Sequence, residues 1–293
     1  MISYIAFMKR EFTSSKFLFD TIGKKIATFE EQEEALSIAY LILEKLFGIN
    51  KTDIVIDKKI EYLAVTKEAM DEILRRLTKK EPIQYILGEA DFFGRKFIVD
   101  ENVLIPRQET EELVDLIKTD NGRLNLKILD IGTGSGCIPI TLALEMNEAK
   151  VFSVDIDENC LALADRNAKR NNATVQFFQT DILKEDFPIV ALDIVVSNPP
   201  YVRQSEKLVM RKKVLEYEPH LALFVADEEP LVFYKTIAKK AAKHLKKEGK
   251  LYFEINEGLG EGVKALMESE GFIGVEIVKD LNGKDRIVWG VKH

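Results

Sequence analysis

The 293-residue sequence contains few residues that bind metals or form disulfides: two cysteines and three histidines, with a single tryptophan. Cys137 and Cys160 have neither the spacing of zinc ligands nor the number needed for a disulfide framework, so no metal site is expected. No apolar run is long enough to span a membrane. Lys9 and Arg10 follow the first apolar stretch instead of preceding it, which is the wrong order for a signal peptide. These absences predict a cytoplasmic protein.

The sequence also lacks an excess of positive charge. Its 42 lysines and arginines are outnumbered by 49 aspartates and glutamates, which gives a formal net charge of −7. A broad surface for nucleic acid is therefore not expected. Two local basic clusters, at 211–213 and 239–247, are typical of solvated helix faces. Apolar residues make up 46% of the chain, which is enough for the cores of two domains.

The spacing of apolar residues changes near residue 90. The segments 30–47 and 66–77 are amphipathic and predict helices of a small bundle, with Thr66 as the N-cap of the second. Residues 92–105 instead contain short apolar runs, and the break at 100–102 predicts the turn of a β-hairpin. The first twenty residues match no pattern, and we interpret them as either an additional helix or a poorly ordered arm.

From residue 125 onward, predicted strands alternate with predicted helices. The strands are expected at 127–131, 150–155, 175–179, 192–197, 250–255, 274–279 and 285–291, and the helices at 137–145, 158–171, 230–245 and 259–270. Such alternation predicts an α/β fold with a doubly wound parallel sheet. Only the short turn 280–284 separates the last two strands, so the final strand is expected to run antiparallel.

The expected architecture is therefore a seven-stranded sheet with one antiparallel strand, in a Rossmann-like fold. This arrangement is associated with S-adenosylmethionine (AdoMet) methyltransferases, although such a likeness concerns the fold alone. We predict three parts: an N-terminal helical domain at 1–88, a β-hairpin connector at 89–110 and the α/β domain at 111–293.

A glycine-rich turn follows the first predicted strand of the α/β domain. It offers five backbone positions to a ligand: Gly132, Thr133, Gly134, Ser135 and Gly136. Glycine removes side chains where the backbone approaches a ligand and where the next helix packs on the sheet. Asp155 ends the next strand, about 20 residues on, where an acid holds ribose hydroxyls. The turn alone is also compatible with any tight strand-to-helix connection, but together with Asp155 it predicts a nucleoside ligand.

Four further positions lie near the expected strand ends. Asp181 either faces an adenine ring or caps a turn, and Ile182 beside it is expected to pack on the ring. Asp130 either orients the glycine turn or lies near the amino group of the cofactor. Asp157 is expected to cap the helix that begins near residue 158.

The most informative segment is Asn-Pro-Pro-Tyr, at 198–201, after the fourth predicted strand. The side-chain oxygen of Asn198 and the backbone carbonyl of Pro199 can each accept one N–H of a planar NH₂ group. This aims the nitrogen lone pair at an electrophile and stabilises the developing positive charge. Proline supplies a rigid carbonyl without a competing N–H, and the Tyr201 ring can pack on the flat group. We predict Asn198, Pro199 and Tyr201 as catalytic residues and Pro200 as a further substrate-binding residue.

The order of these motifs resembles the HemK/PrmC family of protein-glutamine methyltransferases, from about residue 28 to the C-terminus. Other segments follow in the family order: 82–88 (PIQYILG), 92–94 (FFG), 103–107 (VLIPR), 217–219 (YEP) and 285–286 (DR). The tetrapeptide alone is shared with enzymes that methylate exocyclic amines of nucleobases. The segments 82–88 and 105–111 point to the glutamine branch.

The resemblance implies methyl transfer from AdoMet, with S-adenosyl-L-homocysteine as the product. The acceptor would be the side-chain amide nitrogen, N5, of the glutamine in the Gly-Gly-Gln motif of class I peptide chain release factors, which act in translation termination. The resemblance places the cofactor at 132–136, Asp155, Ile182 and Asn198, and the glutamine at 198–201. The N-terminal domain would dock the release factor, and neither a membrane nor a direct nucleic-acid substrate is expected.

One departure from the family lies at Gln108, where the family has the second proline of Pro-Arg-Pro-Glu-Thr. The charged pair of Arg107 and Glu109 remains, so activity is expected to survive. Arg107 either neutralises the carboxylate of AdoMet or bridges the two domains, and we favour the bridge.

Several residues are expected to support the site without touching the substrate. Glu254 ends a predicted strand beneath it. Tyr217 either belongs to a loop that closes the pocket or ends a helix that Pro219 stops, and we favour the helix end. Asp285 and Arg286 are expected to hold the terminal hairpin together.

Three other functions share part of this pattern. A glutamine methyltransferase acting on a ribosomal protein would have the same tetrapeptide. A nucleic-acid exocyclic-amine methyltransferase would need a basic groove and, on duplex DNA, base flipping, which the net charge of −7 disfavours. A non-catalytic AdoMet-binding module would not need an intact tetrapeptide.

Overall fold

The computed structural model describes residues 11–122 and 124–293. The chain divides into two compact units, one that ends at Leu87 and one that runs from Gly88 to His293. Part of the segment predicted as an extra helix or an arm belongs to regular structure, since residues 11–14 form a strand and residues 15–20 begin a helix. The rest of that prediction, on residues 1–10, lies outside the described residues.

The N-terminal unit is a group of helices around an apolar core, as predicted. Its elements are β1 (Glu11–Ser14), α1 (Ser15–Ile26), α2 (Gln32–Phe47), α3 (Lys51–Val55), β2 (Lys59–Tyr62), α4 (Ala64–Leu77) and α5 (Ile83–Leu87). The predicted N-cap at Thr66 was wrong, because α4 begins two residues earlier and Leu63 holds the cap position. The Thr66 hydroxyl instead reaches back and accepts the backbone N–H of Leu63 at 3.0 Å.

The second unit begins with the hairpin β3 (Glu89–Phe92) and β4 (Arg95–Ile98). The predicted turn at 100–102 was wrong, because the chain reverses at Phe93 and Gly94. Both residues have positive φ, 50° and 71°, as tight two-residue hairpin turns require. The buried rings of Phe92 and Phe97 pack edge to face, with their centroids 5.9 Å apart, and so hold the two strands together on either side of that turn.

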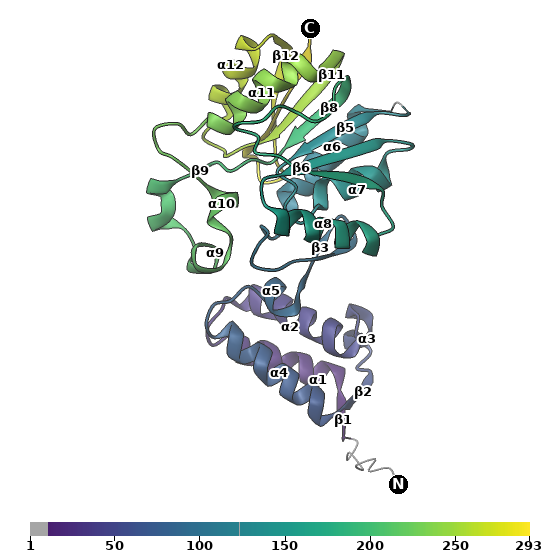
Figure 1. Cartoon of the computed structure of the whole chain (residues 1–293). Coiled ribbons are helices and arrows are strands. Elements are labelled where there is room, and N and C mark those ends of the chain that lie inside the picture. Colours follow the sequence, from purple (N-terminus) through teal and green to yellow (C-terminus); the bar gives the residue numbers. More distant parts are fainter. Residues whose placement is uncertain (1–10, 123) are drawn as a thin grey trace. The chain divides into compact units, whose positions relative to one another are not determined.

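A seven-stranded sheet forms the centre of the second unit, in the order β12-β13-β11-β8-β5-β6-β7 (Figure 1). Its strands are β5 (Lys127–Ile131), β6 (Lys150–Asp155), β7 (Val175–Gln179), β8 (Leu192–Ser197), β11 (Leu245–Glu254), β12 (Phe272–Lys279) and β13 (Asp285–Lys292). Strand β13 lies between β11 and β12 and runs antiparallel to both, while the other pairs are parallel. The predicted sheet and its one antiparallel strand are confirmed.

Helices cover both faces of this sheet (Figure 1). They are α6 (Gln108–Asp120), α7 (Cys137–Glu145), α8 (Glu158–Arg170), α11 (Val232–His244) and α12 (Gly260–Ser269). Neighbouring strand residues point to opposite faces, so Ile128 packs in a core with α6, α7 and α8, and Leu129 packs in a second core with α11 and α12. None of the helices in the described ranges has the length and apolarity that a membrane crossing requires.

An arm of short elements connects β8 to α11. It contains β9 (Val202–Arg203), the 3₁₀ helix η1 (Gln204–Val209), α9 (Lys212–Tyr217), α10 (His220–Leu223) and β10 (Phe224–Val225). The predicted helix end at Tyr217 is confirmed, because Glu218 is the C-cap and Pro219 follows it. The arm therefore begins directly after the Asn-Pro-Pro-Tyr segment, and its two ends meet where β10 pairs with β9.

Candidate active site

A cavity of about 300 Å³ opens where the parallel strands β5, β6 and β8 end. Its lining includes these predicted site residues: Gly132, Thr133, Gly134, Ser135, Asp155, Asp181, Ile182, Asn198, Pro199 and Pro200. Two predicted site residues, Gly136 and Tyr201, lie outside the lining. Because the carboxyl ends of parallel strands meet at one edge of a sheet, motifs far apart in the sequence share this cavity.

Backbone conformation fixes the glycine turn. Gly132, Gly134 and Gly136 have φ angles of 83°, 49° and 80°, in the left-handed region that residues with a Cβ enter only with strain. A Cβ on Gly134 would meet no atom within 4 Å and would occupy open space beside the lining. The turn therefore keeps space that a ligand can fill.

Gly136 serves packing instead of the cavity, because a Cβ there would lie 2.8 Å from Ile140 Cδ1 and 3.1 Å from Ala164 Cβ. We expect Gly136→Ala to lower the free energy of unfolding by about 2–4 kcal/mol, from the left-handed backbone and the clash together. Urea denaturation measures this loss. The matched variant Gly134→Ala has the same backbone problem but no clash, and should lose about 1–2 kcal/mol. Equal losses in the two variants would contradict the packing role.

Asp130 lies beneath the turn and does not line the cavity. The Ser153 hydroxyl donates to Asp130 Oδ2 at 2.6 Å and also contacts the Thr133 hydroxyl, so the carboxyl is linked to the turn through Ser153. Burial raises the pKa of Asp130 to about 7. Of the two roles predicted for Asp130, these contacts favour orientation of the turn.

Asp155 closes the other side of the turn. Its Oδ2 accepts the backbone N–H of Gly134 at 2.9 Å, and its Oδ1 accepts that of Asp157 at 3.0 Å. Burial raises the pKa of Asp155. Each carboxylate oxygen has a second lone pair, so the side chain is able to accept hydroxyl groups of a ligand as well. Asp157 caps α8 as predicted, since its carboxylate accepts the N–H of Asn159 at 2.8 Å.

The segment after β7 gives the cavity an apolar wall. Ile182 is 9% exposed and belongs to both the lining and the core. Asp181 also lines the cavity, but its carboxylate accepts the N–H of Leu183 at 3.0 Å and pairs with Lys184 at 2.8 Å. The pair with Lys184 lowers the pKa of Asp181. The turn-capping role left open for Asp181 is the one that these contacts favour.

Lys240 of α11 anchors this wall. Its Nζ donates to the backbone carbonyl of Ile182 at 2.6 Å and to that of Glu185. The prediction that this basic cluster is a solvated helix face was wrong for Lys240, because the two carbonyls replace water around the ammonium group.

Asn198 follows β8 and meets two residues from other elements. Its Nδ2 donates to Thr110 Oγ1 at 3.4 Å, and the Thr110 hydroxyl donates to Glu254 Oε2 at 2.7 Å. The preceding Ser197 ties β8 to β5, since its hydroxyl donates to the carbonyl of Ile131 at 2.8 Å. The base of the tetrapeptide is therefore held by hydrogen bonds as well as by the sheet.

Tyr201 packs its ring against the apolar core on the α11 side of the sheet and is half-buried. Burial raises the pKa of its phenol. Contact between the Tyr201 ring and a substrate remains a prediction.

Arg107 is bound to the arm within the second unit. Its Nη2 lies 2.5 Å from Oε1 of Glu218, which is only 4% exposed, and Oε2 of Glu218 accepts the N–H of Ile105 at 3.3 Å. The buried carboxylate of Glu218 requires a charged partner, which Arg107 supplies. This ion pair ties the loop 102–107 to the start of α10, and both segments line the cavity. The favoured role of Arg107 as a bridge between the two domains stays a prediction.

Glu254, the last residue of β11, is 1% exposed and lies behind Asn198, as predicted. Burial raises its pKa to about 7, although the bond from Thr110 and the charge of Arg286 act in the opposite direction. The carboxyl group therefore titrates near neutral pH.

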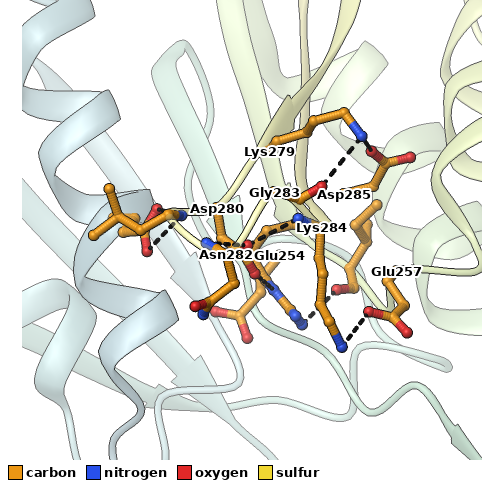
Figure 2. Close-up of polar contacts among 12 residues, drawn as sticks. Glu254, Glu257, Lys279, Asp280, Asn282, Gly283, Lys284 and Asp285 are labelled. Carbon is orange, nitrogen blue, oxygen red and sulfur yellow. Dashed lines mark hydrogen bonds and ion pairs between the residues drawn. The ribbon is translucent and has the colours of Figure 1, made fainter.

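The terminal hairpin of β12 and β13 holds Arg286 in place. Arg286 Nε donates to Oδ2 of the buried Asp280 at 3.1 Å, and Nη1 donates to the carbonyl of Ile255 at 3.3 Å. Figure 2 shows the polar network of this turn, in which Lys279 pairs with Asp285 at 3.0 Å, with Glu254 in the same view. The predicted role of Asp285 and Arg286 in the hairpin is confirmed.

Two contributors to the site were missed from the sequence. Thr110 lies on the buried face of α6, among apolar residues. Asn167 lies on the buried face of α8, and its Nδ2 donates to the carbonyls of Ser135, at 2.8 Å, and Ile98, at 2.9 Å. A polar side chain in the apolar stripe of a helix was the available signal for both.

Both parts of the chain match families of known proteins. A PrmC N-terminal domain matches residues 25–88, and a methyltransferase small domain matches residues 108–221. A release factor glutamine methyltransferase from Flavobacterium psychrophilum is 44% identical over 267 residues, covering 90% of this chain and 94% of the relative. Its counterpart from Bacteroides thetaiotaomicron is 45% identical over 257 residues, with 87% and 92% covered. A crystal structure of a methyltransferase from Pyrococcus furiosus shares the fold, with a TM-score of 0.51, 18% identity, and 76% and 98% covered.

Proposed function

The chain belongs to the release factor glutamine methyltransferase family, and we propose that it methylates the side-chain amide nitrogen of a glutamine in a class I release factor, with AdoMet as methyl donor. The observation that carries the proposal is one cavity that joins the glycine turn and Asp155 to Asn198 and Pro199. The glycine turn and Asp155 suit a nucleoside ligand, and Asn198 and Pro199 suit a planar NH₂ group.

Features of the lining fit AdoMet. The backbone at Gly134 leaves open space, and the carboxylate of Asp155 keeps lone pairs for two ribose hydroxyls. Ile182 offers an apolar surface for the adenine ring. When bound, AdoMet supplies an electrophilic methyl group carried on a sulfonium.

The chain's own part in the reaction is to hold the glutamine amide. Asn198 Oδ1 and the carbonyl of Pro199 accept one N–H each, which directs the nitrogen lone pair toward the cofactor side of the cavity. The same two oxygens stabilise the positive charge that develops on the nitrogen. Catalysis then depends on orientation and electrostatics instead of proton abstraction before transfer.

The target glutamine is proposed to be that of the Gly-Gly-Gln motif, which enters the cavity as an exposed loop. The N-terminal unit, which matches the PrmC N-terminal domain, is proposed to dock the rest of the release factor. Because release factors act in translation termination, we place the enzyme in the cytoplasm.

The proposal is tested by methyl transfer from labelled AdoMet to purified release factor. The parallel samples are the same factor with its Gly-Gly-Gln glutamine changed to alanine, a ribosomal protein and tRNA. We expect label only on the release factor that keeps its Gly-Gly-Gln glutamine. Label on the ribosomal protein or on tRNA instead, or equal label on both release factors, would overturn the proposed substrate.

A further inference from the structure

Two residues with no role in the proposed reaction stand behind Asn198. Thr110, in α6, is 3% exposed, and Glu254, at the end of β11, is 1% exposed. The Nδ2 of Asn198 lies 3.4 Å from Thr110 Oγ1, which lies 2.7 Å from Glu254 Oε2. The three side chains form a chain of hydrogen bonds that leads from the cavity into the core.

The direction of this chain follows from counting protons. The Thr110 hydroxyl has one proton, and an ionised carboxylate is able only to accept it. The oxygen of Thr110 is then left as an acceptor toward Asn198, which must present its NH₂ group. The reverse orientation of the amide would bring Asn198 Oδ1 against Thr110 Oγ1, two acceptors with no proton between them.

We propose that Thr110 and Glu254 are positioning residues that fix the orientation of the Asn198 amide, so that its oxygen faces the substrate. The inference rests on the proposed role of Asn198 as an acceptor for the glutamine NH₂ group. A reversed Asn198 amide would present its own N–H groups to the N–H groups of the glutamine and would repel the substrate. The pair therefore acts on turnover through Asn198, although Thr110 itself also lines the cavity.

The charge of Glu254 decides how firmly the orientation is held. A protonated Glu254 is able to donate to Thr110, which frees the Thr110 proton for Asn198 Oδ1 and stabilises the reversed amide. The titratable and charged groups that face Glu254 come from the start of α6, from β13, α7 and α11, and from the tetrapeptide: Arg107, Glu109, Arg286, Cys137, Tyr234 and Tyr201. With burial, they leave the pKa of Glu254 at about 7.

This arrangement predicts a pH dependence of kcat. Because the ionised carboxylate orients Asn198, kcat should rise with pH and reach half its maximum near pH 7, when measured with saturating AdoMet and release factor. Glu254→Gln should remove this pH dependence. The variant thereby distinguishes the titration of Glu254 from that of Asp130, whose pKa is also about 7. A midpoint near pH 7 that persists in Glu254→Gln would contradict the role of Glu254.

The decisive variant is Thr110→Val, which keeps the shape of the side chain and removes the hydroxyl. We expect kcat to fall about 10- to 100-fold, with AdoMet affinity changed by less than about twofold. Thr110→Ser, which keeps the hydroxyl, should restore most of the kcat. The matched control is Thr141→Val in α7, which removes a buried hydroxyl that has no hydrogen-bond partner in the described part of the chain, and which should leave kcat unchanged.

A second measurement tests whether Thr110 and Glu254 act through one chain of hydrogen bonds. The pH profile of Glu254→Gln, in which Thr110 is intact, keeps the inference testable if Thr110→Val disturbs the fold. In the double variant Thr110→Val with Glu254→Gln, the loss of kcat should not exceed that of Thr110→Val alone, because both residues act through one chain. Unchanged kcat in Thr110→Val, or losses that multiply in the double variant, would overturn the inference. No label on the release factor from the wild-type enzyme would instead overturn the proposed function itself.

Discussion

Asn198→Ala is expected to lower kcat for release factor methylation by about 10²- to 10³-fold while the protein stays folded and binds AdoMet. The variant removes one of the two proposed acceptors for the glutamine NH₂ group, and the loss of one preorganised polar group at a reacting centre has an effect of this size. The cofactor side of the cavity changes little, because Asp155 and the glycine turn stay in place. Single-turnover kinetics with saturating AdoMet give the rate, and calorimetry gives the affinity.

A matched asparagine separates this effect from a general one. Asn121 follows α6, and its Nδ2 donates to the carbonyl of Ile117 at 2.7 Å and to the Tyr252 hydroxyl at 3.0 Å. It is absent from the cavity lining, so Asn121→Ala should change kcat by less than about twofold. Equal kcat in Asn198→Ala and the wild type would refute the assignment of the tetrapeptide as the active site.

Asp155→Ala is expected to weaken AdoMet binding by about 10²-fold or more. It removes a carboxylate that is able to accept two ribose hydroxyls, and each such charge-assisted bond contributes about 1.5–3 kcal/mol. The same change leaves the backbone N–H groups of Gly134 and Asp157 without their acceptor. Calorimetric titration with AdoMet measures the loss.

Asp157→Ala is the matched control for that experiment. Asp157 lies two residues away and also lines the cavity, but its carboxylate serves as the N-cap of α8. Its removal should lower stability by about 1 kcal/mol and change AdoMet affinity far less than Asp155→Ala does. Similar affinities in the two variants would show that Asp155 does not hold the ribose.

The substitution at Gln108 has a simple structural explanation. Gln108 is the first residue of α6 and is exposed. Proline is favoured at the first position of a helix because no hydrogen bond is lost there, and glutamine is also a good helix former. The exchange therefore leaves Thr110, two residues later, on the buried face of α6, in keeping with the expectation that activity survives.

The sheet could be predicted from the sequence because each of its determinants is local. Apolar runs bounded by turn residues define buried strands, and the short turn 280–284 leaves no room for a crossover, so β13 had to run antiparallel. The position of the cavity could be predicted as well, because the glycine turn, Asp155 and the tetrapeptide all lie at strand ends. These features need no knowledge of which residues meet across the fold.

Pairings between distant residues could not be predicted. Arg107 is 111 positions from Glu218, and Thr110 is 144 positions from Glu254. No periodicity carries such information, because the partners are chosen by how the arm and α6 pack on the sheet. The prediction of the hairpin turn failed for a different reason. The polar residues at 100–102 gave a stronger turn signal than Phe93 and Gly94, where the chain reverses.

The measurement that tests the central claim most directly is the location of the transferred methyl group by tandem mass spectrometry. Release factor is incubated with AdoMet and either the wild-type enzyme or Asn198→Ala, and then digested. We predict one methyl group on the side-chain nitrogen of the Gly-Gly-Gln glutamine, formed by the wild type and nearly absent with the variant. A methyl group elsewhere in the factor, or the same product formed equally fast by Asn198→Ala, would contradict the account.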